Sequence, residues 1–383
     1  MIHLKNIVNY IRTFLILTIS SAILWGSPVL ADDTDFLKAA FSGEISTIKQ
    51  LLEKGTHVDY QNDMGFSALI VASQYGHTDI VNLLLEKNAT IDLKNAGGAT
   101  ALIIAAKNGH TDIVNTLLKK GAQFDVQTTD GITALMLAIQ KGHDAIVDTL
   151  LAKGANIHLQ TKEKLTALII AALEGRTHIV DKLLAKNAQV DAQASDNTTA
   201  LYMAARNGHT AIVEKLLAHK AAVNLLAIND TTPLFVAAQN GHTDIVKALL
   251  AQGAKVDLQD KNGATALTLA ALIGNTDIVE LLLKHGAKVD HKATNGFTAL
   301  ILAAQNGHTA TIELLLSNGA TMDLQNDDGV TALMWAALHD HAEAVKVLLA
   351  KGANTKLKSK TGRTAAEIAK DPAIKEMLPA VSN

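Results

Sequence analysis

Three short motifs in the sequence have the residue types of serine acyl-transfer chemistry. Ser46-Thr47-Ile48-Lys49 has the spacing S-x-x-K, Ser195-Asp196-Asn197 is S-D-N, and Lys360-Thr361-Gly362 is K-T-G. In this order they match the motif set in which a serine attacks an acyl group with a lysine close by. That reaction requires all three motifs within hydrogen-bond reach of one another, so it depends on how the chain is organised.

The fifteen histidines raise a second possibility, a metal site. A metal ligand bond is about 2.0–2.1 Å long, whereas equivalent side chains in stacked repeats are ~9–10 Å apart. His339 and His341 are close together but have no third ligand near them in the sequence. We therefore expect no metal and no cofactor, and a structural place at a helix start for six histidines that share one spacing: His77, His110, His143, His209, His242 and His308.

The remaining sequence offers little for catalysis or for nucleic acid. It contains no Cys, which excludes disulfides, thiolate metal sites and a Cys nucleophile. It also contains no H-E-x-x-H, P-loop or G-x-G-x-x-G motif. A net charge of −3 lacks the basic excess typical of nucleic-acid binding, so no nucleic-acid partner is expected.

All of these residues are positioned by an internal repeat of 33 residues. The phrase Gly98-Ala99-Thr100-Ala101-Leu102 returns at Gly263 and Gly296 with small changes, and Asp63 to Ser359 holds nine repeats in 297 residues without insertion or deletion. A period of this length indicates a stacked array rather than one globular core. The array separates Ser46, Ser195 and Lys360 by several repeats each, so we expect no enzyme.

One repeat can be interpreted residue by residue. Thr100 is placed to cap a short helix over 101–108, and Gly109 to end that helix in the left-handed conformation. A second helix is expected to open at His110 and Thr111. Its buried stripe, at helical spacing, is Ile113, Val114, Leu117 and Leu118.

This repeat resembles the ankyrin repeat, whose pattern is Thr-Pro-Leu-His-x-Ala-Ala, a Gly-His step, a second helix and Gly-Ala. The resemblance covers residues 33–383 and implies an all-α, curved and elongated solenoid of helix-turn-helix units with β-hairpin or turn connections. The sequence departs from the pattern in two ways. Only Thr232-Pro233-Leu234 keeps the proline, and the His after Leu is replaced in every repeat, as by Ile70 and Ile103.

The array is expected to be capped at both ends. Residues 32–62 form a degenerate first unit, 63–359 the nine regular repeats, and 360–383 a shortened last unit. The middle is less regular: glycine positions are occupied by Lys164, Asn197, Asp230 and Lys220, and the apolar connection 225–228 interrupts a polar pattern. Either these changes are drift in a tolerant array, or the connection is an exposed contact patch.

Residues 1–31 have the features of a signal peptide. Lys5 and Arg12 precede an apolar run, and Val29-Leu30-Ala31 precedes acidic residues, so we expect cleavage after Ala31 and a periplasmic or secreted protein. The alternative is an uncleaved membrane anchor, because the apolar stretch approaches the ~18 residues needed to span a bilayer. With cleavage, no stable membrane insertion is expected.

Comparison among the repeats locates the expected binding surface. Positions around the turn glycine and at the end of the first helix vary freely, and in ankyrin-like folds these line the concave groove. Large apolar, aromatic and basic residues there are favoured at interfaces; the alternative is that some fold back onto the next repeat. The candidate partner-binding residues are Met64, Phe66, Tyr75, Lys107, Ile132, Lys141, Leu165, Leu173, Arg206, Leu226, Ile228, Leu272, Ile273, Phe297, Leu338 and His339.

The function expected from the resemblance is a monomeric, non-enzymatic scaffold that binds a protein partner through the groove. A second hypothesis is a protective or structural accessory that stabilises partner enzymes with loose specificity. A third is a small-molecule or metal binder. The first predicts one stoichiometric partner, the second many weak partners, and the third a shift of the melting temperature by the ligand alone.

Overall fold

The computed structural model describes residues 31–378, so the expected signal peptide, residues 1–31, lies outside that range apart from Ala31. All regular elements within 31–378 are helices, and β-structure there is limited to one isolated antiparallel bridge between Gln61 and Ser67. The all-α fold of helix-turn-helix repeats is thus confirmed, with turns as the connections. None of the helices in the described range is long and apolar enough to cross a membrane.

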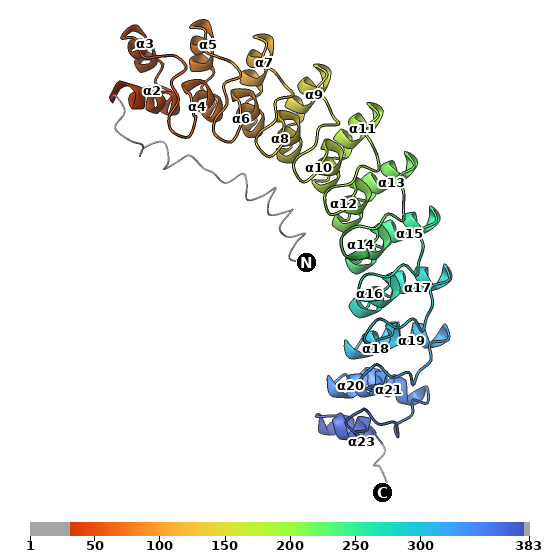
Figure 1. Cartoon of the computed structure of the whole chain (residues 1–383). Coiled ribbons are helices and arrows are strands. Elements are labelled where there is room, and N and C mark those ends of the chain that lie inside the picture. The colour runs from red at the N-terminus through yellow and green to blue at the C-terminus, as the bar shows by residue number, and fades with distance from the viewer. Residues whose placement is uncertain (1–30, 379–383) are drawn as a thin grey trace. The chain divides into compact units, whose positions relative to one another are not determined.

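The chain divides into two compact units, of which unit 1 ends at Lys162 and unit 2 begins at Glu163. Within each unit the first helices of the repeats form one row and the second helices another (Figure 1). The first helices of unit 1 are α2 (Ala31–Ser42), α4 (Ala68–Tyr75), α6 (Ala101–Asn108) and α8 (Ala134–Lys141). Its second helices are α3 (Ile45–Glu53), α5 (Thr78–Glu86), α7 (Thr111–Lys119) and α9 (Asp144–Ala152).

Unit 2 has the same two rows. Its first helices are α10 (Ala167–Leu173), α12 (Ala200–Asn207), α14 (Pro233–Gln239), α16 (Ala266–Ile273), α18 (Ala299–Gln305), α20 (Ala332–Leu338) and α22 (Ala365–Ile368). Its second helices are α11 (Thr177–Ala185), α13 (Thr210–Ala218), α15 (Thr243–Ala251), α17 (Thr276–Lys284), α19 (Thr309–Ser317), α21 (Ala342–Ala350) and α23 (Pro372–Met377).

The first helix of each regular repeat begins as the sequence predicts. The hydroxyl of Thr100 accepts a hydrogen bond from the backbone N–H of Ile103, and Ser67 and Thr133 cap α4 and α8 in the same way. Such a cap satisfies one of the N–H groups that an α-helix leaves without a partner in its first turn. Gly109 then ends α6 in the left-handed conformation, at φ 81°.

The irregular positions of the middle keep the backbone that glycine would have. Lys164, Asn197, Asp230 and Lys220 all have positive φ, between 56° and 62°. Asn and Asp reach this region at little cost because their short polar side chains can hydrogen-bond to the nearby backbone, whereas Lys lacks this compensation and the conformation costs it more. The repeat geometry therefore overrides the local preference of these residues.

Stacking depends on small side chains in the first helices. Ala105 and Ala106 on α6 are completely buried, as are their equivalents Ala171 and Ala172 on α10. Their short side chains let neighbouring first helices approach closely. The second helices bury one stripe each, exemplified by Leu117, which is 0% exposed.

Carboxylates in the connections that follow the second helices link successive repeats. Asp92 accepts a hydrogen bond from the backbone N–H of Gln123 at 3.1 Å, and Asp125 accepts one from Asn156 at 2.9 Å. The same bond, spanning 31 residues, recurs at Asp191, Asp257, Asp290 and Asp323. Each bond satisfies an N–H in the connection after a second helix and fixes the spacing of two repeats.

Candidate interaction surface

The three motifs of serine acyl-transfer chemistry are distributed over separate repeats. Ser46 lies in α3 of unit 1, whereas Ser195 and Lys360 lie in turns of unit 2 that precede α12 and α22. The short 3-10 helix η2 (Ile228–Asp230) and the turns at 261–263, 294–296 and 327–329 lie between Ser195 and Lys360 in the sequence. The two unit 2 motifs therefore cannot form one site, and their turns have a structural role: the N–H of Lys360 donates to the carbonyl of Asp328.

The histidine row is a set of structural links between repeats. The Nε2–H of His110 donates to the carbonyl oxygen of Gln74 at 2.9 Å, and His143 donates likewise to Lys107 at 3.0 Å. The same bond, to a carbonyl oxygen 36 residues earlier in the sequence, is made by His77, His209, His242 and His308, and also by His341. Residues 31–378 contain no group of three or more potential metal ligands.

The glycine that ends a first helix makes room for this histidine. Gly76 has φ 80°, and a Cβ placed on it would lie 2.8 Å from Cε1 of His110. Such a contact is shorter than van der Waals packing allows, so glycine is required both by its backbone conformation and by the ring beside it. The glycine of each Gly-His step therefore accommodates the histidine of the next repeat, as Gly76 does for His110 and Gly109 for His143.

The predicted partner-binding residues fall into two sets. One lies at the C-terminal ends of first helices: Tyr75, Lys107, Lys141, Leu173, Arg206, Leu272, Ile273, Leu338 and His339. The other lies in the turns and connections before them: Met64, Phe66, Ile132, Leu165, Leu226, Ile228 and Phe297. Within each unit, successive members of a set are brought close because the first helices of neighbouring repeats pack against one another.

Three of these residues have little surface to offer a partner. Phe66 is 8% exposed, Leu165 is 2% exposed and Leu173 is 8% exposed. Their side chains are buried inside the units. For these three residues the structure therefore agrees with the alternative interpretation, in which some candidate residues fold back onto the repeats. They support the surface but do not contribute contact area to it.

All strongly exposed large hydrophobic residues in the described chain lie at the ends of first helices or in the connections before them, which together we call the first-helix side of the repeats. Leu226 is 43% exposed, Ile273 42%, Phe41 39% and Leu272 36%. Phe41, Leu272 and Ile273 lie at the ends of α2 and α16, and Leu226 lies in the connection before α14. No second helix in residues 31–378 contributes such a residue.

In unit 1 this surface combines aromatic and basic groups. The rings of Phe41 and Tyr75 meet edge to face with centroids 4.5 Å apart. Burial raises the pKa of the Tyr75 hydroxyl. Burial, and then the positive charge of Lys141, lower the pKa of the Lys107 ammonium. The sequence analysis did not identify Phe41, because residues 32–62 match the repeat pattern poorly. The 33-residue period could have found it, since Phe41 lies one period before Gln74, at the end of a first helix.

In unit 2 the surface has the exposed apolar residues Leu272 and Ile273 among polar ones such as Asn207 and Asn306, and it has stacked rings near its C-terminal end. Phe297 and Trp335 have centroids 5.5 Å apart, and Trp335 stacks on His339 at 5.4 Å. The indole N–H of Trp335 is buried without a hydrogen-bond partner. The sequence analysis also did not identify Trp335, because the equivalent position is apolar and without a ring in every other regular repeat, as at Leu302 and Met203.

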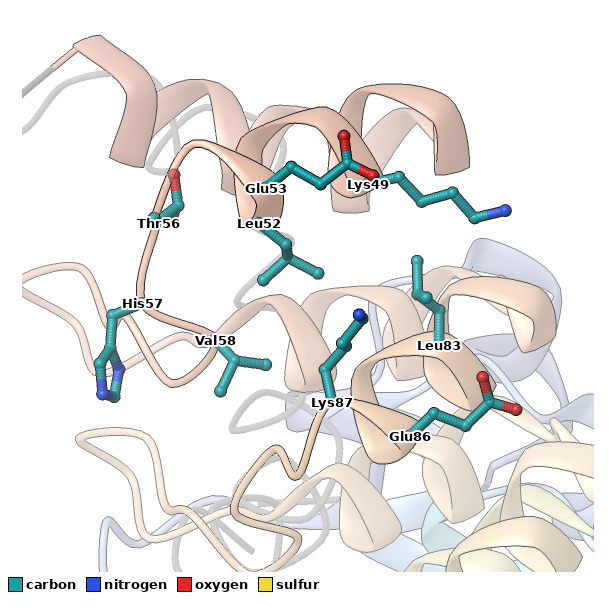
Figure 2. Close-up of a pocket in the computed structure, with 10 residues that line it drawn as sticks. Lys49, Leu52, Glu53, Thr56, His57, Val58, Leu83, Glu86 and Lys87 are labelled. Carbon is teal, nitrogen blue, oxygen red and sulfur yellow. The ribbon is translucent and has the colours of Figure 1, made fainter.

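A pocket of about 570 Å³ lies apart from this surface, between the second helices α3 and α5. Figure 2 shows Leu52, Val58, Leu83 and Lys87 among the side chains around it. Two lysines and two glutamates line it, Lys49, Lys87, Glu53 and Glu86, so it has no net charge to select a ligand. None of the predicted partner-binding residues contributes to it.

Comparison with known families agrees with the repeat described above. No curated protein is similar enough to the chain to be matched to it. The family model for ankyrin repeats (three copies) matches residues 36–130, 91–161, 135–227, 168–260, 234–326 and 300–371, which together span nearly all of the described chain. The chain therefore belongs to the ankyrin repeat family.

Proposed function

We propose that this protein is a non-enzymatic scaffold that binds a protein partner through the ends of its first helices and the turns before them. Ankyrin repeats are generic protein–protein interaction modules. The observation that carries the proposal is that the large exposed hydrophobic residues, Phe41, Leu226, Leu272 and Ile273, are confined to that side. Exposed apolar groups that recur at the same side of the repeats are typical of an interface.

The experiment is quantitative capture of partners from the native compartment with the full chain. Replacing Leu272 and Ile273 together by Ser should weaken binding of a stoichiometric partner at least tenfold, because buried apolar anchors dominate interface energies. The matched control is Asp277→Lys with Glu280→Lys, on the second helix α17 of the same repeat. Loss of the partner with the control variant alone would place the binding surface on the second helices and contradict the proposal.

The accessory hypothesis makes a different prediction for the same experiment. A protein that protects many enzymes with loose specificity should capture several partners at low occupancy, and substitutions of single repeats should reduce each of them only slightly. One partner at constant stoichiometry supports the scaffold, while a broad and weakly affected set supports the accessory.

Export after cleavage at Ala31 is part of the proposal. Helix α2 begins at Ala31 and has Asp32 and Asp33 in its first turn. Cleavage would leave these carboxylates at the helix N-terminus, where the helix dipole favours negative charge. N-terminal sequencing of the natural protein should give Asp32 first; a chain that begins at Met1 and sediments with membranes would contradict it.

A further inference from the structure

The junction between the first helices α14 and α16 of unit 2 lacks the histidine bond found at its neighbours. At the other junctions between α10 and α20, a histidine of one repeat donates to the carbonyl oxygen of a first-helix residue in the repeat before it; these histidines are His209, His242, His308 and His341. The equivalent residue at α14 and α16 is Asn275. Its Oδ1 accepts a hydrogen bond from the N–H of Ile278 and caps α17, while its Nδ2 lies 3.5 Å from the carbonyl oxygen of Gly241. Asn275 therefore does not make the bond that a histidine would make here.

The acceptor that a histidine would use at this junction is the carbonyl oxygen of Gln239, which lies 36 residues before Asn275. This oxygen accepts no hydrogen bond from residues 31–378. Gln239 is exposed and is the last residue of α14. Carbonyl groups at a helix C-terminus carry partial negative charge and need donors from outside the helix. The end of α14 thus presents an acceptor that the described chain leaves without a donor.

The absence of the ring also leaves room at this junction. A Cβ placed on Gly208 would lie 2.7 Å from Cε1 of His242, so the imidazole fills the space beside that glycine. A Cβ placed on Gly241 would have Nδ2 of Asn275 at 3.4 Å and Cδ1 of Ile273 at 3.8 Å as its nearest atoms. The space beside Gly241 is therefore less filled, and Ile273 borders it.

An exposed apolar pair lies at the same junction. Ile273 is 42% exposed and Leu272 is 36% exposed, and both lie at the end of α16. The equivalent pairs at the ends of α14 and α18 are polar, Gln239-Asn240 and Gln305-Asn306. The junction of α14 and α16 thus combines an acceptor without a donor and an apolar surface.

The charges around the junction have both signs. Asp244 and Asp277 lie in the first turns of α15 and α17, while Lys247 lies on α15 and Arg206 near the end of α12. They leave no excess of one sign that would select a charged ligand. A neutral hydrogen-bond donor is complementary to the negative end of α14 and avoids the desolvation cost of a charge.

We propose that the junction of α14 and α16 binds a Trp or Tyr side chain of the protein partner, with the ring against Leu272 and Ile273 and its N–H or O–H directed to the carbonyl oxygen of Gln239. This rests on the proposed function and names the side chain that anchors the partner. The bonds of His242 and His308 show that a ring donor fits the equivalent carbonyl at the neighbouring junctions. Trp and Tyr combine a large apolar ring with a donor that needs an acceptor when it is buried, and both are enriched among interface anchors.

The test begins with the full chain and a random peptide library displayed on phage. Peptides selected on the unaltered chain should be enriched in Trp and Tyr. Each selected peptide is then synthesised again with Phe in place of its Trp or Tyr, which keeps a ring and removes the donor. Fluorescence anisotropy should show about tenfold weaker binding of the Phe peptide, because the carbonyl of Gln239 is then covered without a donor.

Two variants of the chain locate the site. Asn275→His gives this junction the residue that the next junction has at His308, so its own imidazole should donate to Gln239 and fill the site. Binding of the selected peptides should weaken about tenfold, and the melting temperature should rise. The matched control is Asn318→His at the C-cap of α19, where the repeat before has His285, and it should change neither quantity. Leu272→Gln with Ile273→Asn gives α16 the polar end of α14 and should also weaken the peptides.

Folding of each variant is checked by circular dichroism. Selected peptides without Trp or Tyr enrichment, Phe peptides that bind equally well, or binding that survives Asn275→His would overturn the inference while leaving the proposed scaffold standing. Enrichment of Lys and Arg in place of Trp and Tyr would assign the carbonyl to a cation and would also overturn it. Failure of the proposed function would appear instead as insensitivity of partner capture to all first-helix substitutions.

Discussion

The two helices of one repeat distribute their surfaces differently. In α6 the buried residues are Ala101, Leu102, Ile103, Ala105 and Ala106, and solvent is reached mainly at the C-terminal end. In α7 the buried residues are Ile113, Val114, Leu117 and Leu118, and the rest of the helix surface faces solvent along its whole length. The first helix is therefore the stacking element, with its free surface confined to one end.

This difference explains where sequence variation is tolerated. The last residue of the first helix or its cap is Tyr75, Asn108, Lys141, Glu174, Asn207, Asn240, Ile273, Asn306 or His339 in the nine regular repeats. A change there alters charge and apolar surface without touching the stack. The second helices keep Ile-Val or a close equivalent at the buried step, as at Ile80-Val81 and Ile245-Val246. Recognition can thus diverge from repeat to repeat while the framework stays constant.

The largest expected effect is removal of a buried side chain from a second helix. Leu117→Ala on α7 should lower the free energy of unfolding by ~2–5 kcal/mol, because it leaves a cavity where the residue is 0% exposed. Lys119→Ala on the same helix should change it by less than about 0.5 kcal/mol. Hydrogen exchange should show loosening that is strongest in the repeats next to α7; uniform opening of unit 1 would contradict an array stabilised by neighbour contacts.

The second prediction concerns a first helix, in which a buried side chain is enlarged instead of removed. Ala105→Leu on α6 adds volume between packed first helices and should cost ~1–3 kcal/mol. The control is Lys141→Ala at the exposed end of α8, expected to be nearly neutral. Chemical denaturation of both variants measures the difference. Equal stability of the two variants would mean that the first helices do not stack as tightly as their burial indicates.

A smaller effect is expected for the histidine links. His110→Ala removes the hydrogen bond to the carbonyl of Gln74 and should destabilise by about 1 kcal/mol. His219→Ala is the matched control, since the exposed His219 bonds only Lys215 within its own turn. Similar losses for the two variants in thermal unfolding would show that the link between repeats adds nothing to stability.

The sequence predicted the fold in detail because the framework positions depend on local chemistry. The cap at Thr100, the helix over 101–108, the left-handed end at Gly109 and the stripe through Leu117 all follow from spacing and residue type, and each is confirmed. The positive φ at Lys164 is predicted only by the repeat, because its own side chain disfavours it. Repetition therefore supplied information that a single segment lacked.

The surface was less predictable, for a physical reason. Phe66 and Leu165 occupy the position after the turn residue, as do Ile132 and Phe297, yet Phe66 and Leu165 are buried while Ile132 and Phe297 are partly exposed. Which way such a side chain turns depends on its neighbours in the adjacent repeat, across about 33 residues of sequence. The carboxylate row through Asp92 also escaped prediction, because each bond joins a side chain to a backbone N–H 31 residues later.

The smallest expected effect concerns the C-terminal end of the array, where α22 is only four residues long and is held by its cap. Thr364 donates hydrogen bonds to Oε2 of Glu367 from its N–H at 2.7 Å and from its hydroxyl at 3.1 Å. The backbone N–H bond, followed by the hydroxyl bond, lowers the pKa of the Glu367 carboxyl from its ordinary value of 4.5. Because the folded-state pKa lies below the unfolded one, the cap's contribution is complete above the unfolded pKa and is lost as the pH falls through the folded pKa.

Amide protection factors in α22 should therefore fall between about pH 6 and about pH 3 before those of α20 do. Glu367→Gln keeps an acceptor oxygen without the charge, so its α22 should be less protected at about pH 6 and nearly insensitive to the same pH change. If unaltered chain and variant lose protection in parallel, the cap has no part in holding α22, and the shortened last repeat must be held by its packing against α20 alone.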